Sequence, residues 1–147
     1  MAYGLIGNSI IARGNFQSAG NTIIDVNNPA PSRGIMKLWG VYLNNGVANV
    51  KVKIFRDDGT NYVFMYESAL VSCSVYANID LPCWIPVEGG DLIGVYCAGE
   101  EFECGSTANL LRLKAGDITT TTLKTTWTAS VGPLSTEGKI FTRIAPF

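Results

Sequence analysis

The sequence predicts an all-β protein built as an antiparallel two-sheet sandwich. Apolar residues recur at every second position along most of the chain, as Val50, Val52 and Ile54 do with Lys51 and Lys53 between them. Side chains on a strand point to opposite faces in turn, so this period is typical of strands with one face on a core. Turn residues separate the alternating segments, and no segment has helical spacing. We therefore expect under about a tenth of the chain to be helical.

The alternating segments give the predicted strands in chain order: 4–13, 21–26, 34–44, 47–56, 61–67, 69–77, 79–87, 91–98, 108–114, 122–130 and 138–144. The turns between them are Asn27-Asn28-Pro29, Asn44-Asn45-Gly46, Asp57-Asp58-Gly59, Glu88-Gly89-Gly90-Asp91, Ala115-Gly116-Asp117 and Gly132-Pro133. Asn-Gly and Asp-Gly supply the positive φ of tight turns, so the hairpin from Val47 to Glu67 is the best-defined element. Short strands with no helix between them indicate a sandwich or a barrel. We expect one domain over residues 1–147.

The segment 79–87 has two features that set it apart from the other predicted strands. Pro82 and Pro86 both lie within it. Proline cannot donate to the hydrogen-bond ladder of a sheet, so we expect this strand at an edge. Trp84 is out of phase with the apolar residues of the strand and should therefore point outward.

Charge and composition argue against several classes of partner. Eleven basic and 12 acidic residues give a net charge of -1, without the basic stripe that nucleic acid requires. Only 16% of residues are charged, against roughly 25% in an ordinary domain. Two interpretations remain open: part of the outer surface is covered by another chain, or Thr, Asn, Ser and Gly supply an ordinary polar surface.

The ends and apolar stretches of the sequence bear on location. The N-terminus lacks a basic segment followed by a long apolar run, so we expect no signal peptide. No apolar stretch approaches the roughly 20 residues that span a bilayer, so we expect no membrane insertion. These features favour a protein made and kept in a cytosol, and assembly into a virion in the host cytoplasm also fits them; the alternative is an extracellular protein without a cleavable signal.

The four cysteines are interpreted as core residues. Cys73, Cys83, Cys97 and Cys104 are each in phase with apolar neighbours, where a free cysteine acts as a small hydrophobe. They form no C-x-x-C pair and the chain has no histidine, which argues against zinc. We expect reduced thiols, with Cys83 and Cys97 buried on adjacent strands; a disulfide between those two is the alternative.

Catalytic signatures are absent from the sequence. Without histidine the chain lacks the commonest general base and the usual nucleophile-activating pairs, so we expect no enzyme activity and no cofactor. The acidic residues at turns are typical of side chains that cap their own backbone. A calcium site is conceivable from carboxylates near one loop, although a solvated acidic loop is the favoured interpretation; the candidates are Asp91, Glu100, Glu101 and Glu103.

One segment resembles a known class of folds. Residues 85–96, Ile-Pro-Val-Glu-Gly-Gly-Asp-Leu-Ile-Gly-Val-Tyr, read as a strand, a Gly-Asp turn and a second strand. This segment is similar to the penultimate hairpin of jelly-roll sandwiches, among them surface domains of phage and viral particles and carbohydrate-binding modules. The resemblance covers a dozen residues and implies a jelly-roll-like fold.

Aromatic residues are the candidate contacts. Trp84 should point outward, and Tyr62, Phe64 and Tyr66 share one face of their predicted strand. Exposed aromatic rings anchor protein interfaces or stack on sugars, whereas rings that close a second layer of core would have neither role. We therefore expect a structural component of a particle, such as a phage capsid decoration or tail-associated protein. It would form a trimer or larger ring and contact a capsid or tail protein; the alternative is a carbohydrate-binding module with a glycan partner.

Overall fold

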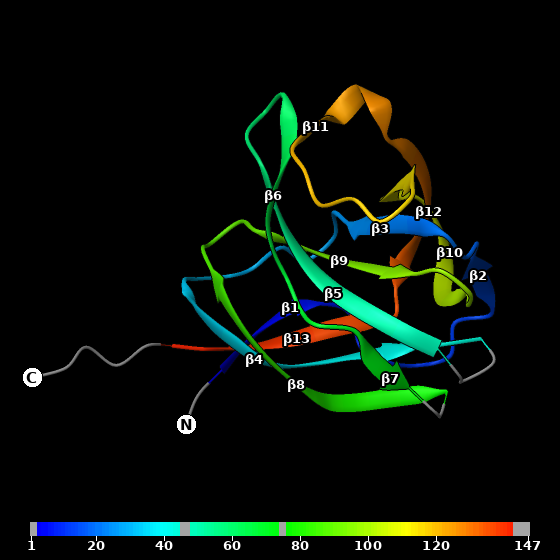
Figure 1. The fold of residues 1–147 in the computed structure, drawn as a ribbon, viewed down its shortest axis with the longest axis horizontal. Helices are drawn as coiled ribbons and strands as arrows, with labels where there is room; N and C mark the ends of the chain where they lie inside the picture. Colours follow the sequence, from blue (N-terminus) through cyan, green and yellow to red (C-terminus); the bar gives the residue numbers. More distant parts are fainter. Residues whose placement is uncertain (1–2, 45–47, 74–75, 143–147) are drawn as a thin grey trace, which may run out of the picture.

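The computed structural model describes residues 3–44, 48–73 and 76–142, which form two antiparallel sheets. In spatial order, sheet A contains β1 (Tyr3–Gly7), β13 (Thr136–Phe141), β4 (Gly34–Tyr42) and β8 (Ala77–Val87). Sheet B contains β11 (Thr122–Leu123), β6 (Asn61–Glu67), β5 (Ala48–Asp57), β9 (Leu92–Cys97), β3 (Asn21–Asp25), β10 (Phe102–Ala115) and β12 (Thr128–Leu134). Two short strands complete sheet B, β2 (Asn15–Gln17) on β10 and β7 (Val71–Cys73) on β5. The all-β sandwich is confirmed (Figure 1).

The connections follow a jelly roll. The strands β1, β3, β4, β5, β6, β8, β9 and β13 lie in the orders β1-β13-β4-β8 and β3-β9-β5-β6, and all connections except β5 to β6 cross between the sheets. A jelly roll of two interleaved Greek keys has this arrangement. Between β9 and β13 the chain adds β10, β11 and β12, which widen sheet B on both sides.

Several predicted boundaries are wrong, for local reasons. The strand predicted at 4–13 ends at Gly7, whose φ is +85°. The strand predicted at 122–130 divides into β11, a 3₁₀ turn (Lys124–Thr126) and β12. The first half of β10 and all of β2 were not predicted. Residues 45–47, 74–75 and 143–147, on which parts of the predictions fall, lie outside the described residues.

The segment 85–96 is not a hairpin. Its first strand, β8, pairs with β4 in sheet A, whereas β9 pairs with β3 and β5 in sheet B. The turn from Glu88 to Asp91 therefore carries the chain from one sheet to the other. By contrast, the predicted β5–β6 hairpin is confirmed, with Gly59 at φ +96° in its turn.

β8 lies at the edge of sheet A, as its prolines predict. Its alternation breaks at one point: Ile79, expected on the core face, is exposed. The pairing with β4 shifts between Trp39↔Leu81 and Val41↔Asn78, and Asp80 has a φ of +52° at this bulge. An extra residue in one strand reverses the facing of the residues beyond it.

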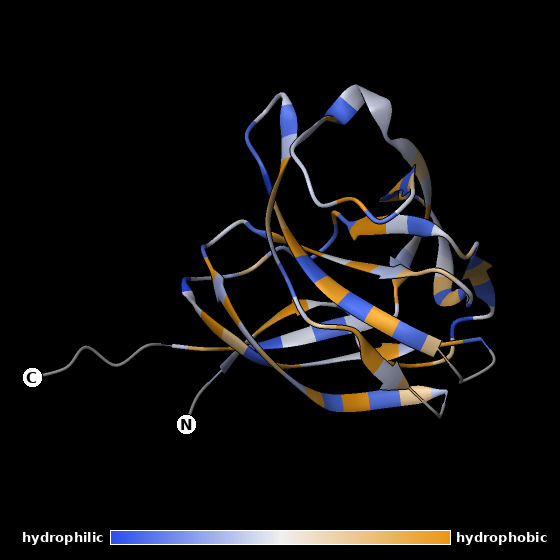
Figure 2. Ribbon diagram, in the orientation of Figure 1, coloured by the Kyte–Doolittle hydropathy of each residue, from blue (hydrophilic) through white to orange (hydrophobic). Residues whose placement is uncertain are grey.

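Two apolar clusters hold the fold together. The larger lies between the inner faces of the sheets and includes Ile6, Met36, Trp39, Val52, Ile85, Ile93 and Leu134. The smaller lies on the opposite face of sheet B, under the segment from Asp117 to Trp127, and consists of Ile24, Phe55, Tyr62, Leu92 and Trp127. Figure 2 shows the alternation that divides β5 between the two faces.

A buried carboxylate ties three strand ends together. Asp25 Oδ2 accepts hydrogen bonds from Asn8 Nδ2 at 2.6 Å and from the Leu134 backbone N–H at 2.9 Å. Its Oδ1 accepts one from the backbone N–H of Asn27 at 2.7 Å. Burial raises the pKa of Asp25 from 3.8 to about 6, because desolvation outweighs these hydrogen bonds.

Asp25 should make the stability of the protein depend on pH. Since its folded pKa is raised, its stabilising contribution is fully present below about pH 4 and is lost as pH rises through about 6. We expect wild type to lose roughly 2–3 kcal/mol of unfolding free energy relative to Asp25→Asn between these limits. Urea denaturation of both proteins across this pH range measures the difference between their unfolding free energies. The contributions of the other carboxylates are the same in both proteins and cancel in this difference. If the unfolding free energy of wild type relative to Asp25→Asn stays constant or rises with pH, the raised pKa of Asp25 is contradicted.

Candidate functional site

The outer face of sheet A presents an apolar and aromatic surface. The register of the strands places Tyr3, Phe141, Ile35 and Pro86 in one row across all four strands. We define the sheet A face as Tyr3, Leu5, Ile35, Lys37, Trp84, Lys139 and Phe141. Tyr3, Leu5 and Trp84 are exposed, and the other four side chains are half-buried.

Two lysines lie over the rings of this face. Lys37 Nζ is 5.0 Å from the ring centroid of Trp84 and 5.6 Å from that of Phe141. Lys139 Nζ is 5.2 Å from the ring of Tyr3, which packs on Phe141 at 5.5 Å. Cation–π contacts of this kind favour one arrangement of the side chains without removing them from solvent. Trp84 is 68% exposed within this surface.

The predicted aromatic face of β6 divides between the core and the surface. Tyr62 is buried and packs edge-on against Trp127 at 5.6 Å; Phe64 packs against Phe55 at 5.7 Å. Of the three predicted contacts on this strand, only Tyr66 is exposed, at 44%. Tyr62 and Phe64 close a second layer of core because the segment from Asp117 to Trp127 folds over sheet B. Ile118 and Trp127 are the apolar residues in that threonine-rich segment from which its packing against the sheet could have been predicted.

An ion-pair cluster fastens this covering segment. Lys53, whose side chain is fully buried, donates to Glu67 at 2.8 Å and to Asp117 at 2.5 Å. Its ammonium also donates to the carbonyl oxygen of Ile118 at 2.8 Å. Lys51 pairs with the same two carboxylates. A buried ammonium must have such partners, so the cluster fixes the segment on the sheet.

The candidate calcium ligands are separately engaged. Asp91 pairs with Arg56, and Glu103 accepts hydrogen bonds from the backbone N–H groups of Arg13 and Gly14. Glu101 accepts one from Asn44 Nδ2, and Glu100 accepts one from the backbone N–H of Glu101. Within residues 3–44, 48–73 and 76–142, no group of three or more Cys, Asp or Glu side chains is placed to hold a metal ion. The four carboxylates are thus not gathered into one site.

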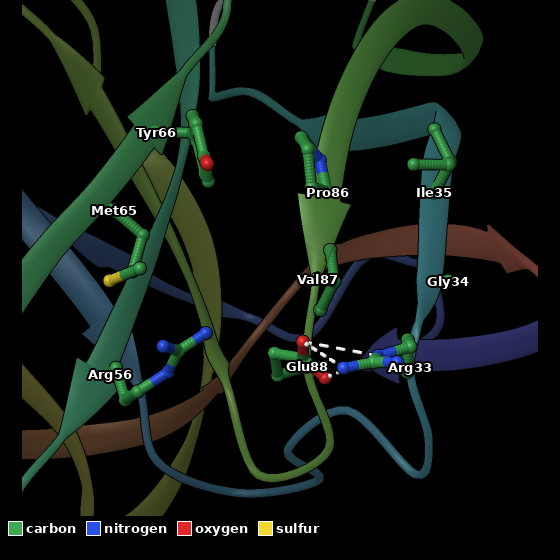
Figure 3. A pocket seen from close by; sticks show the side chains of 9 residues that line it. All are labelled: Arg33, Gly34, Ile35, Arg56, Met65, Tyr66, Pro86, Val87 and Glu88. Carbon is green, nitrogen blue, oxygen red and sulfur yellow. Dashed lines mark hydrogen bonds and ion pairs between the residues drawn. The ribbon is translucent and has the colours of Figure 1, made fainter.

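A cleft opens where β6 of sheet B approaches β8 of sheet A (Figure 3). Its volume is about 470 Å³, and the side chains that line it include Arg33, Ile35, Arg56, Met65, Tyr66, Pro86, Val87 and Glu88. Tyr66 is one of the aromatic contacts that the sequence predicts, whereas the two arginines are not predicted from it. Arginines near acidic residues are common on protein surfaces, so they give no signal in the sequence. Only the fold brings Arg33, Arg56 and Glu88 together.

The cysteines lie where burial suppresses their reactivity. Cys73, Cys97 and Cys104 are buried, Cys83 is half-buried and not buried as predicted, and all four are free thiols. The adjacent-strand prediction is wrong, because Cys83 lies on β8 of sheet A and Cys97 on β9 of sheet B. Desolvation raises the pKa of Cys83 to about 11 and raises those of Cys73 and Cys104. Raised pKa values lower the thiolate fraction that nucleophilic chemistry needs.

Comparison of the chain with known proteins gives no relationship: no family model, no curated protein and no solved structure matches it. In the described part of the chain, no helix has the length and apolarity needed to cross a membrane.

The thiols should be slow to react in the folded protein. At pH 8, a pKa of about 11 leaves Cys83 about a hundredfold less ionised than a free cysteine. We expect slow reaction with a chromogenic disulfide reagent in buffer and four thiols in denaturant. Two or fewer thiols in denaturant would reveal a disulfide, and rapid reaction in buffer would contradict the raised pKa of Cys83.

Proposed function

We propose that this protein is a non-enzymatic structural component that assembles with copies of itself through the sheet A face. The observation that carries the proposal is the difference between the two outer faces of the sandwich. Sheet B is covered by the protein's own segment from Asp117 to Trp127, fastened by Lys53. On the outer face of sheet A, Ile10 lies over Gly40 at one end, but the aromatic and aliphatic side chains of Tyr3, Leu5 and Trp84 stay exposed.

The charges of this region favour a second copy as the occupant. Lys37 and Lys139 are accompanied by Asp80, which pairs with Lys139 at 3.0 Å, and by Glu137 on the neighbouring position of β13. Two cations and two anions leave the region without net charge, so identical faces do not repel each other. Exposed apolar patches beyond roughly a few hundred Å² mark interfaces in most soluble proteins, and closed symmetry buries them on identical chains.

A particle is the setting that we propose for this assembly. Double-sheet jelly rolls recur in viral capsid domains, where they pack as identical copies. The jelly-roll order of the strands and the low charge content support a capsid decoration or a tail-associated protein in a virion. Fold alone does not fix function, so the sheet A face is the part that an experiment should address.

Carbohydrate binding, outside the cell, is the second candidate. Jelly rolls also occur in lectin domains, and the exposed rings of Trp84 and Tyr66 can each stack on the C–H face of a sugar. This function requires no self-assembly, which separates it from the first.

Charge placed on the sheet A face should disrupt assembly. We expect Leu5→Lys and Trp84→Lys each to weaken self-association at least about tenfold, because the new ammonium would be buried beside Lys139 or Lys37 without an added carboxylate. Leu123→Lys, at a similarly exposed position on β11 of the other sheet, is the control and should leave assembly unchanged. Light scattering and native mass spectrometry at tens of micromolar give the copy number. A monomeric wild-type protein would contradict the proposal, and so would equal effects of all three variants.

A further inference from the structure

The cleft between β6 and β8 has the composition of a small-ligand site. Figure 3 shows Arg56, Met65 and Tyr66 on one side and Pro86, Val87 and Glu88 on the other. Its volume of about 470 Å³ lies within the roughly 300–1,000 Å³ typical of ligand pockets. About half of its wall is apolar or aromatic, and the charged side chains of Arg33, Arg56 and Glu88 lie together at one end.

Arg56 is held rigidly at that end. Its Nε donates to Asp91 Oδ1 at 2.8 Å and its Nη2 to Asp91 Oδ2 at 3.1 Å. Asp91 is itself 1% exposed and accepts a further hydrogen bond from the backbone N–H of Glu88. The Arg56 side chain remains 40% exposed. Since a guanidinium has five N–H donors, three of them have no partner among the described residues.

An acceptor lies beside these donors. Glu88 forms a bidentate pair with Arg33, in which Arg33 Nε donates to Oε2 and Nη2 to Oε1, each at 3.0 Å, and the Glu88 side chain is 46% exposed. Each carboxylate oxygen can accept more than one hydrogen bond, so Glu88 retains capacity toward the cleft. The two arginines are balanced by Glu88 and Asp91, so this end of the cleft carries no net charge.

Donors and acceptors side by side, without net charge, match hydroxyl groups, which donate and accept at once. An anionic ligand would meet Glu88, and a cationic one would meet the two arginines. The ring of Tyr66, with Met65 and Pro86 nearby, offers the apolar surface on which the C–H face of a sugar packs. We propose that the cleft binds an uncharged saccharide, with hydroxyls on Arg56 and Glu88 and the ring on Tyr66.

Trp84 is the less suitable platform. Lys37 already lies 5.0 Å from the centroid of its ring, so a sugar would have to displace the ammonium or use the other face alone. Trp84 also lies on the open sheet A face, whereas the walls of the cleft come from both sheets. The cleft adjoins the sheet A face at Ile35, but Arg56, Tyr66 and Glu88, which would bind the saccharide, are not part of that face.

Titration followed by NMR tests this inference. The probes are galactose, glucose and N-acetylglucosamine with their disaccharides, and glucuronic acid serves as the acidic counter-probe. We expect saturable binding of at least one uncharged probe, with shifts at residues 33, 56, 66 and 88. Tyr66→Ala should weaken it about tenfold and Arg56→Lys about fivefold, since lysine preserves the charge facing Asp91 but not the planar donors.

Two controls isolate the cleft. Tyr76→Ala removes an exposed tyrosine elsewhere and Trp84→Ala removes the exposed tryptophan of the sheet A face; both should retain the wild-type affinity. Binding lost in Trp84→Ala but kept in Tyr66→Ala would overturn the inference and move the site to sheet A. Preference for glucuronic acid, or no saturable binding of any uncharged probe, would also overturn it. Residues 33, 56, 66 and 88 lie outside the sheet A face, so their shifts report binding separately from assembly.

Discussion

A sandwich of two sheets has four faces, and packing the sheets together buries only two of them. The fate of the remaining two faces governs the rest of this structure. On sheet B the chain solves the problem internally: the segment from Asp117 to Trp127 covers Tyr62 and Phe55, and Lys53 anchors it through carboxylates and a carbonyl. On sheet A, Ile10 lies over Gly40 at one end, whereas Tyr3, Leu5 and Trp84 stay exposed. The apolar side chains of that face, and the function that we propose for them, follow from this asymmetry.

Lys53 illustrates how polar chemistry can position an apolar layer. A fully buried ammonium is unfavourable unless its hydrogen bonds are satisfied, so the covering segment must bring Asp117 and the carbonyl of Ile118 to one place. The surrounding rings pack only when that condition is met. An apolar side chain at position 53 could be buried equally well. It has no directional hydrogen bonds, however, so it would allow the segment to pack on the sheet in several positions. We expect the ion pair to contribute specificity, a role that buried charges have in some proteins.

The sequence was sufficient for the fold class and for features that depend on neighbours in the chain. Alternation located most strands, the turn at Gly59 defined its hairpin, and Pro82 and Pro86 placed β8 at an edge. It failed where distant segments decide. The bulge at Asp80 exposes Ile79, and the segment from Asp117 to Trp127 buries Tyr62. The cleft depends on residues 33, 56, 66 and 88, which come from four places in the chain, so no local pattern could reveal it.

The edges of sheet A limit how copies of this protein could join. Adding strands side by side into an open filament requires two free edges on every molecule, one to receive the next copy and one to be received. The prolines and bulges of β8 remove one of them, because the ladder lacks donors and regular spacing there. Only β1 is left, and two copies meeting through β1 would leave no sheet A edge for a third. Edge-to-edge pairing of sheet A therefore stops at two copies. The protein cannot form a fibril by adding sheet A strands in this way, even though the outer face of that sheet carries exposed rings.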